Sequence, residues 1–142
     1  MIHDRDIKIM RELRRNSRSS LASIAKKTGI PLSTIYDRIK TKEIELIKKH
    51  TSILDFPKLG YNIRAKVLLR IWDTEQFQKF AVQHPNINSV FKLNSEYNFM
   101  IDCIFRYMSE MQELTAEIDK FGVRKQQTHF VSEEIARENF MN

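Results

Sequence analysis

Glycine and proline are scarce in this chain, and their scarcity limits what it can fold into. Among 142 residues there are only three of each. Such a chain is neither collagen-like nor dominated by flexible linkers, and each glycine or proline marks a break in regular structure. The breaks fall at Gly29, Pro31, Pro57, Gly60, Pro85 and Gly122. They predict uninterrupted helices and strands joined by short connections.

Two helices are predicted before the first proline. Residues 4–15 repeat apolar side chains at intervals of three on one face, which are Ile7, Met10 and Leu13. Residues 21–28 form a second helix, with Ser20 as an N-cap that accepts a backbone N–H. Gly29 follows it and can adopt the left-handed conformation that ends many helices.

A third helix is predicted from about Pro31 to Lys42. Proline suits the first turn of a helix because its missing N–H would be unpaired there. Ile35 and Ile39 lie four residues apart and define its buried face. Three helices with a short turn between the second and the third are typical of a helix-turn-helix, whose last helix enters the major groove of DNA. A plain bundle used for protein contacts gives the same pattern.

The opposite side of this third helix carries side chains that suit DNA. Each residue advances about 100° around the helix axis, so the polar residues fall away from the buried face. They are Ser33, Thr34, Asp37, Lys40 and Thr41, flanked by Tyr36 and Arg38. Ser, Thr and Tyr hydroxyls bond phosphates or base edges, and Lys and Arg neutralise phosphates. Asp37 either accepts from a cytosine amino group or pairs with a neighbouring side chain.

Positive charge is concentrated in the same region. The formal net charge is +6, but residues 1–50 hold 13 Lys and Arg against 6 Asp and Glu, whereas residues 51–142 hold 11 against 12. A basic module joined to a near-neutral one indicates a polyanion-binding part, although a solvated basic surface has the same charge. We expect phosphate contacts from Arg18, Lys26 and Lys27, within a pool that also holds Arg5, Arg11, Arg14, Arg15, Lys48 and Lys49.

The remaining chain alternates strands and helices. Strands are predicted at 64–72, 87–93, 97–105 and 123–132, and helices at 74–84 and 109–121. This order is the split βαβ pattern of a ferredoxin-like fold, whose single sheet has helices on one face only. The other face is solvated or covered by a partner. The predicted domains are a helix-turn-helix DNA-binding domain at 1–55, a linker at 56–63, a ferredoxin-like domain at 64–132 and a tail at 133–142.

Two local features complete the prediction of structure. Thr51, Ile53 and Leu54 predict a short strand, and residues 55–60 predict a tight turn or a single helical turn. A capping box formed by Ser109 and Gln112 is predicted to open the last helix.

Catalytic and metal-binding chemistry has little support in the sequence. The four His residues are scattered, and neither a His-x-x-x-His nor a Cys-x-x-Cys spacing occurs. Cys103 lies in an apolar strand and is predicted to be a small core residue. We therefore expect no enzyme, no metal and no cofactor. The lack of a long apolar run and the charged N-terminus predict neither a membrane span nor a secretory signal, which makes a cytoplasmic location the default.

Several motifs together resemble the Lrp/AsnC (leucine-responsive, feast/famine) regulators. The DNA-binding domain of that family is similar to residues 6–10, 21–29 and 33–40, and its connecting segment to 51–55 and 58–61. Its C-terminal domain is similar to residues 97–100 and 122–123, with Thr128, Val131, Glu133 and Glu134. The resemblance covers nearly the whole chain.

This resemblance implies a cytoplasmic transcription regulator. The implied fold is α+β, with an N-terminal winged helix-turn-helix domain and a C-terminal ferredoxin-like βαββαβ domain of the RAM type. The implied partners are double-stranded DNA, further copies of the chain in dimers, tetramers or octamers, and a small effector such as an amino acid.

Two departures from the family pattern concern the wing and the effector. Residues 43–47 contain no glycine for the wing turn, and Ser95 stands where the effector loop usually has one. An effector is expected at a subunit interface near Asn94, Ser95, Glu96, Tyr97 and Asn98. Glu96 and Asn98 are its expected polar partners, and the alternative is an ordinary strand turn.

Two other functions fit the same two-part fold. One is an enzyme similar to the siroheme decarboxylases, against which the basic first third argues because a tetrapyrrole pocket needs no such charge. The other is an effector-sensing or assembly module that binds no DNA, which a salt-independent affinity for DNA would indicate.

Overall fold

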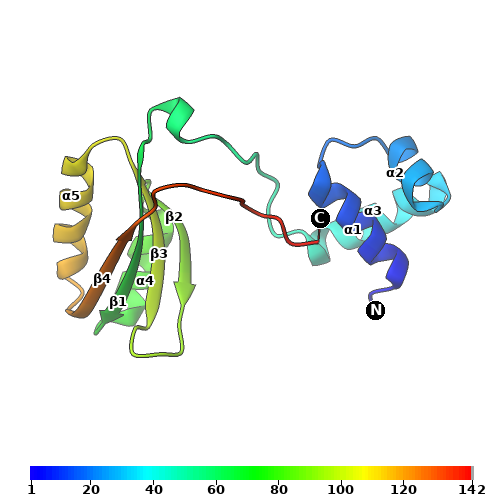
Figure 1. Ribbon diagram of the computed structural model, residues 1–142. Helices are drawn as coiled ribbons and strands as arrows, with labels where there is room; N and C mark the ends of the chain where they lie inside the picture. Colours follow the sequence, from blue (N-terminus) through cyan, green and yellow to red (C-terminus); the bar gives the residue numbers. More distant parts are fainter. Residues whose placement is uncertain (142) are drawn as a thin grey trace. The chain divides into compact units, whose positions relative to one another are not determined.

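The computed structural model describes residues 1–141, which fold into two compact units (Figure 1). The helical unit comprises residues 1–53 and the C-terminal segment that begins at Ile135. The sheet unit comprises Leu54–Glu134. The chain therefore passes between the units twice, because the segment after the sheet returns to the helical unit.

Three helices form the helical unit: α1 (Asp4–Arg15), α2 (Leu21–Thr28) and α3 (Leu32–Leu46). The predicted limits of the first two are confirmed. The predicted end of the third at Lys42 is wrong, because α3 continues for another turn to Leu46. Between α2 and α3, Gly29 has φ 73°, the left-handed conformation that ends α2. The predicted helix-turn-helix is therefore confirmed.

The core of the helical unit is small. Ile9, Ile24 and Ile35, one from each helix, are its fully buried apolar residues. The buried face predicted for α1 is confirmed at Leu13, which packs against this core, but wrong at Ile7, which is 41% exposed while Ile9 is fully buried. The buried side of α1 also carries two carboxylates, Asp6 and Glu12. Because Asp6, Ile9 and Glu12 are buried, the buried side of α1 is displaced by about one residue from the side that the apolar spacing predicts.

The segment after α3 differs from prediction. Thr51–Leu54 forms no strand, and every strand in residues 1–141 belongs to the sheet unit. The wing predicted after the third helix is thus not a strand hairpin here. A single turn of 3-10 helix, Pro57–Leu59, follows and ends at Gly60, which has φ 90°. This confirms the helical turn predicted for residues 55–60.

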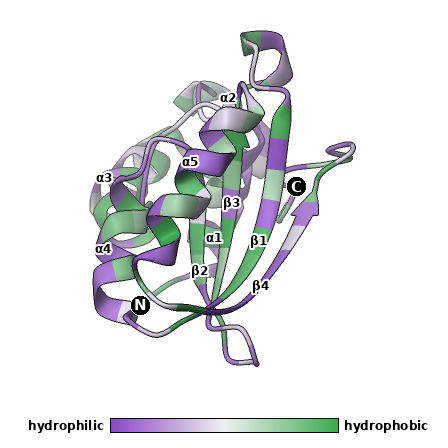
Figure 2. Cartoon of the chain, turned by 90° about the vertical axis from the view of Figure 1, so that its left-hand side faces the viewer, coloured by the Kyte–Doolittle hydropathy of each residue, from purple (hydrophilic) through white to green (hydrophobic). Residues whose placement is uncertain are grey.

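Four antiparallel strands form the sheet, in the spatial order β2, β3, β1, β4 (Figure 2). Along the chain the elements are β1 (Ile63–Ile71), α4 (Thr74–Gln83), β2 (Ile87–Lys92), β3 (Phe99–Phe105), α5 (Met108–Asp119) and β4 (Val123–Phe130). The predicted βαββαβ order and α+β class are confirmed. In this order the first and third strands pair centrally, and β2 and β4 form the two edges.

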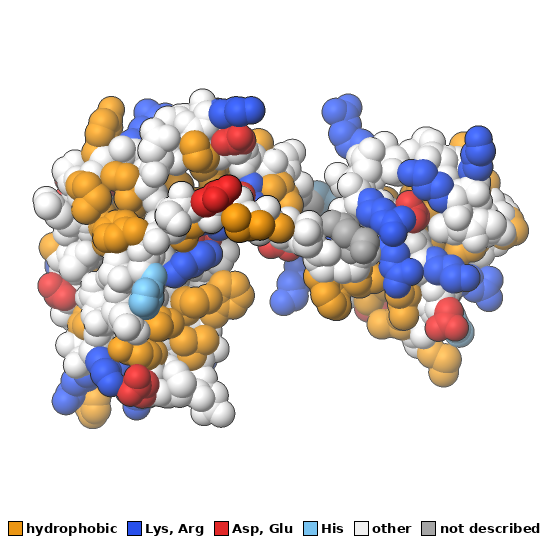
Figure 3. Space-filling view, viewed as in Figure 1, with side chains coloured by type: hydrophobic (Ala, Val, Ile, Leu, Met, Phe, Trp, Pro, Cys, Tyr) orange, Lys and Arg blue, Asp and Glu red, His pale blue; other side chains and the backbone are white. Residues whose placement is uncertain are grey.

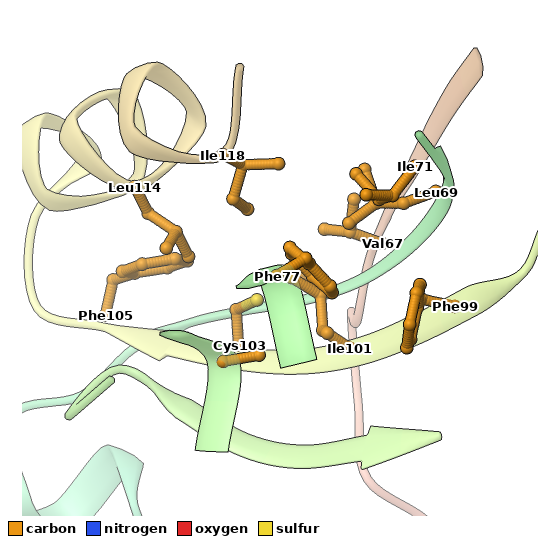
Figure 4. Close-up of a cluster of buried hydrophobic side chains, with 12 residues drawn as sticks. Val67, Leu69, Ile71, Phe77, Phe99, Ile101, Cys103, Phe105, Leu114 and Ile118 are labelled. Atoms are coloured by element: carbon orange, nitrogen blue, oxygen red, sulfur yellow. The ribbon is translucent and has the colours of Figure 1, made fainter. Parts of the chain in front are cut away.

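Both helices of the sheet unit cover the same face of the sheet. Alternate residues of β1 and β3, among them Leu69 and Ile101, point into one core with Phe77 of α4 and with Leu114 and Ile118 of α5 (Figure 4). Cys103 is fully buried in this core, as predicted. Among the described residues, no helix combines the length and apolar character needed to cross a membrane.

The N-terminus of α5 differs from prediction in one detail. The helix begins at Met108, and Glu110 accepts the backbone N–H groups of Arg106 and Tyr107 at 3.2 Å each. The predicted capping box of Ser109 and Gln112 is therefore wrong, because the capping carboxylate comes two residues earlier. A glutamate there satisfies the same unpaired donors and also favours the positive end of the helix dipole.

The second face of the sheet carries polar residues at its centre. Asp102 of β3 accepts two hydrogen bonds from Arg64, at 3.0 and 2.8 Å, and lies 3.1 Å from both Lys66 and Asn88. Its side chain is nearly fully buried although no helix of the sheet unit covers this face. Burial raises and the three partners lower the pKa of Asp102, and the net direction is downward. Asp102 is thus a charged residue held in place by neighbouring strands.

Candidate nucleic-acid interface

The outward side of α3 is polar and exposed. Ser33, Asp37, Lys40 and Thr41 are exposed, and Thr34 is half-buried, while Ile35 on the other side is fully buried. Ile39 contacts the core from the next turn. The structure thus brings the predicted DNA-contacting residues of α3 to one side of the helix, where a groove could receive them.

An aromatic ring extends this surface. Tyr36 is 53% exposed, and the Lys40 ammonium lies 6.0 Å from the centroid of its ring. Among residues 1–141 the carboxylate of Asp37 has no ion-pair partner, so the alternative of pairing with a neighbour is not realised in this structure. The Thr41 hydroxyl donates instead to the Asp37 carbonyl at 2.9 Å. The Asp37 carboxylate and the Lys40 ammonium, neither of which has an ion-pair partner among residues 1–141, therefore lie one turn apart on the exposed side.

The other cations expected at phosphates divide into free and paired ones. Arg18 and Lys26 are exposed, and neither has an ion-pair partner within the described part of the chain. Lys27 lies 4.0 Å from Glu12, and Arg15 donates to the same carboxylate at 3.0 Å. Figure 3 shows Lys and Arg side chains gathered on the visible face of the helical unit. The free ammonium and guanidinium groups can neutralise phosphates without first breaking a protein contact.

Arg38, unlike Arg18 and Lys26, forms an ion pair within the protein. Its Nε donates to Oδ1 of Asp6 at 2.6 Å, and its Nη2 donates to Oδ2 at 2.5 Å. The carboxylate is fully buried, and Oδ2 also accepts the N–H of His3 at 2.8 Å. The Arg38 guanidinium holds the pKa of Asp6 well below its usual value, against the opposite effect of burial. The pair joins α1 to α3.

Arg14, another expected phosphate contact, binds the C-terminal segment of the chain. Its Nε donates to the carbonyl of Phe140 at 2.9 Å, and its Nη2 donates to the carbonyl of Glu138 at 3.0 Å. The Glu138 carboxylate lies 3.4 Å from the same guanidinium. Two backbone carbonyls and a carboxylate thus hold this side chain at the end of α1.

The loop predicted for an effector is closed by its own side chains. The Ser95 hydroxyl accepts the N–H of Tyr97 at 3.2 Å and donates to its carbonyl at 3.0 Å. Ser95 does not have positive φ, so serine needs no strained backbone at this position. Glu96 and Lys125 of β4 form an ion pair at 2.7 Å, and the ammonium lies 5.4 Å from the Tyr97 ring. Asn94 is exposed beside them.

Asn98 has a structural task in this loop. Its side-chain oxygen accepts the N–H of Ile71 at 2.8 Å, and its side-chain nitrogen donates to the Ile71 carbonyl at 2.9 Å. Its backbone N–H donates to Leu69 at 2.9 Å. The amide thus bridges the beginning of β3 to the end of β1, and its hydrogen-bonding groups face the chain itself.

Sequence reasoning missed Asp6 and Glu12 as buried residues. An acid in the first turn of a helix is favourable beside the helix dipole even when it is exposed, so its position alone does not reveal its burial. A signal was nevertheless present, since Asp6 precedes Ile9 by three residues and Leu13 by seven, which places all three on one side of α1. A carboxylate on a buried side requires a cationic partner.

The remaining reactive groups are a single buried cysteine and scattered His, Asp and Glu side chains. Burial raises the pKa of the Cys103 thiol to about 12, which leaves it protonated and unreactive at neutral pH. Among residues 1–141, His, Cys, Asp and Glu side chains nowhere gather in a group able to hold a metal ion.

Two family models match the chain. A winged helix-turn-helix DNA-binding model matches residues 2–41, and a model of the Lrp/AsnC ligand binding domain matches residues 68–140. The first match contains α1, α2 and most of α3, and the second covers most of the sheet unit together with the returning C-terminal segment.

Two relatives of similar sequence are transcriptional regulators. An uncharacterized HTH-type transcriptional regulator of Pyrococcus furiosus is 31% identical over 98% of this chain and 96% of its own length. The HTH-type transcriptional regulator FL11 of the same organism is 32% identical over 71% of this chain and 69% of its own length. These relatives give no support to the alternative of a siroheme decarboxylase.

Solved structures share the fold at lower identity. A transcriptional regulator of Neisseria meningitidis in complex with L-Met has a TM-score of 0.85, with 20% identity over 96% of this chain and 94% of its own. LrpC of B. subtilis has a TM-score of 0.83, with 20% identity over 96% of this chain and 98% of its own. AsnC of E. coli has a TM-score of 0.79, with 16% identity over 100% of this chain and 99% of its own.

The double hydrogen bond of Asn98 predicts a stabilising role. We expect Asn98→Ala to lower the free energy of unfolding by about 1–3 kcal/mol, because it leaves the two polar groups of Ile71 without these partners. Urea unfolding followed by circular dichroism measures this change. Asn94→Ala, in the same loop but exposed, should stay within about 0.5 kcal/mol of the wild type. Equal effects of the two substitutions would contradict the assigned role.

The lowered pKa of Asp6 predicts a dependence of stability on pH. A carboxyl whose pKa is lower in the folded state stabilises above its ordinary value, 3.8, and loses this contribution as the pH falls toward its folded pKa. We therefore expect the stability difference between wild type and Asp6→Asn to be constant near neutral pH and to shrink below about pH 4. Urea unfolding between pH 7 and pH 2.5 measures it. An unchanged difference at pH 3 would show that Asp6 titrates normally.

Proposed function

Because the chain belongs to the Lrp/AsnC family of helix-turn-helix transcriptional regulators, we propose that it reads specific sites in double-stranded DNA with the outward side of α3. The observation that carries the proposal is the exposed polar side of this helix, next to free cations in a module of strong positive charge. An enzymatic activity has no comparable support, since the relatives named above are regulators. A cytoplasmic location follows from a regulator's need to reach DNA.

Different residues take different parts in this proposal. Lys40, Ser33, Thr34 and Asp37 contact base edges, because bases carry the sequence information in the major groove. The residues that surround this base-contacting set contact phosphates, and they are Tyr36, Thr41, Arg18, Lys26 and Lys27. Residues 1–55 thus bind DNA, and residues 64–132 assemble the protein and sense an effector, with residues 56–63 as the linker.

Assembly is proposed to use the face of the sheet opposite α4 and α5. That face bears Phe91 of β2, 50% exposed, paired in register with Met100 of β3, which in turn pairs with Leu68 of β1. A row of apolar side chains across three strands favours contact with a second copy, and a two-fold pairing brings two copies of α3 to one DNA molecule. Half-sites one helical turn apart, or a multiple of it, follow from such a dimer.

An amino acid is the proposed effector, near Asn94–Asn98. The matching ligand-binding model and the regulator solved with L-Met support this class of ligand. Within the loop, Glu96 is exposed and offers a carboxylate to an amino group, while Lys125 beside it offers an ammonium to a carboxylate. Asn98 takes no direct part, because its amide is bound to Ile71.

Selection of bound fragments from genomic DNA tests the central proposal. We expect the protein to retain a small set of fragments, and Lys40→Ala and Thr34→Ala each to lower affinity for them by about 1–3 kcal/mol, the range of a specific base contact. A matched control is Lys79→Ala, which removes an exposed lysine of α4 from the sheet unit. Substitution of a residue that contacts only phosphate should instead reduce the slope of log affinity against log salt by about 0.9. Retention of no duplex at low salt would reject DNA binding.

Calorimetry with a panel of amino acids tests the effector. We expect heat of binding from at least one amino acid and a weaker affinity in Glu96→Gln, which keeps the shape of the side chain but removes its charge. Lys92→Gln, on an exposed residue of β2 outside the loop, is the control. Silence of the wild type across the panel would remove the sensing role and leave DNA binding untouched.

A further inference from the structure

We propose that Arg38 is a positioning residue of α3, and that α3 discriminates between DNA sequences only while Arg38 is bound to Asp6 of α1. The inference deepens the proposed function and rests on it, since it concerns how α3 reads DNA. It also differs from the expectation that Arg38 itself contacts DNA as a flanking cation.

The geometry of the pair is suited to fix a rotation. Two parallel hydrogen bonds join the guanidinium fork to both carboxylate oxygens, at 2.6 and 2.5 Å, and such a pair is directional in a way that apolar contacts are not. The carboxylate end is itself anchored, because Oδ2 also accepts the His3 N–H and the side chain is fully buried. The position of Arg38 around the axis of α3 is therefore set by α1.

The apolar contacts of α3 leave this rotation weakly determined. Ile35 is the one residue of α3 that is fully buried, and Ile39 contacts the same small core. Side-chain tips lie roughly 5–6 Å from a helix axis, so a turn of about 10° moves them by about 1 Å. Hydrogen bonds to bases tolerate less than that. Asp37 and Lys40, one residue before and two after Arg38, would lose their geometry in such a turn.

The electrostatics separates this role from that of a phosphate contact. Arg38 and Asp6 carry opposite charges at the hydrogen-bonding distance, so the pair contributes almost no net attraction for phosphate. Removal of a carboxylate from a DNA-binding module normally strengthens DNA binding, because it makes the module more positive. If Arg38 positions α3 through Asp6, removal of that carboxylate instead weakens binding to a specific site. The two effects have opposite signs.

The test compares Asp6→Asn with Asp4→Asn in the full-length protein. Asp4 lies in the same first turn of α1 but is exposed, so its substitution removes the same charge and leaves the pair intact. The affinities for a duplex selected by the wild type and for a random duplex are measured over a range of salt concentrations. We expect Asp6→Asn to lose at least about tenfold in affinity for the selected duplex, the scale of one base contact, while its affinity for random duplex does not fall.

Each outcome has a defined meaning. Loss of discrimination in Asp6→Asn alone, with the salt slope of the wild type, supports the positioning role. Equal behaviour of Asp6→Asn and Asp4→Asn overturns it while leaving the proposed function in place. A wild type that prefers no duplex over random DNA rejects the proposed function itself, and the inference with it.

A second variant decides the question if Asp6→Asn fails to fold, as judged by circular dichroism. Arg38→Lys keeps the positive charge but cannot form the two parallel hydrogen bonds. Loss of discrimination with a wild-type salt slope again supports positioning. If Arg38→Lys binds the selected duplex as tightly as the wild type does, only the positive charge of residue 38 matters, which overturns the inference in favour of a phosphate contact.

Discussion

The arrangement of the helical unit depends on a buried carboxylate, Asp6 of the first helix, and its pairing with the half-buried Arg38 of the last helix. Of the residues that the structure describes in this unit, only three apolar ones are fully buried, one from each helix, so the apolar core is too small to dictate every angle and rotation by itself. Asp6 is fully buried beside them and is satisfied by Arg38 and by the N–H of His3. Burial of a charge is tolerated only when its partner is in place. Any arrangement that separates α1 from α3 is therefore penalised.

The sheet unit also contains a buried carboxylate whose partners come from neighbouring elements, but this carboxylate lies outside the apolar core. Its core takes side chains from two strands and two helices on one face, and needs no buried ion pair to be complete. On the other face, Asp102 is buried among Arg64, Lys66 and Asn88, which come from the two neighbouring strands. A slip of register would move these partners to the opposite face and leave a buried carboxylate alone. The cluster therefore fixes strand register on the face that α4 and α5 leave uncovered.

Hydrophobic periodicity predicted well the parts of the fold that apolar burial decides. Ile35, Ile39 and the turn at Gly29 defined the helix-turn-helix, and the order of strands and helices defined the sheet unit. It failed where polar groups are buried. Asp6, and not Ile7, lies on the buried side of α1. Periodicity missed this, because a pattern of apolar residues assigns every charge to the surface. The family resemblance assigned the amide of Asn98 to an effector, and the sequence could not show its actual partners, because they are backbone groups of Ile71, far away in the sequence.

Affinity for DNA and discrimination between DNA sequences have different physical origins in this molecule. The positive charge of the first fifty residues acts over a distance, is spread over many side chains and survives the loss of any one of them. In the proposed function, discrimination requires a few atoms of α3 to meet base edges at hydrogen-bond distance, so it depends on the orientation of one helix. Orientation is carried by directional contacts that contribute nothing to the net charge. The residues most important for specificity can therefore be those that never touch DNA, and the two properties can be altered separately by substitution.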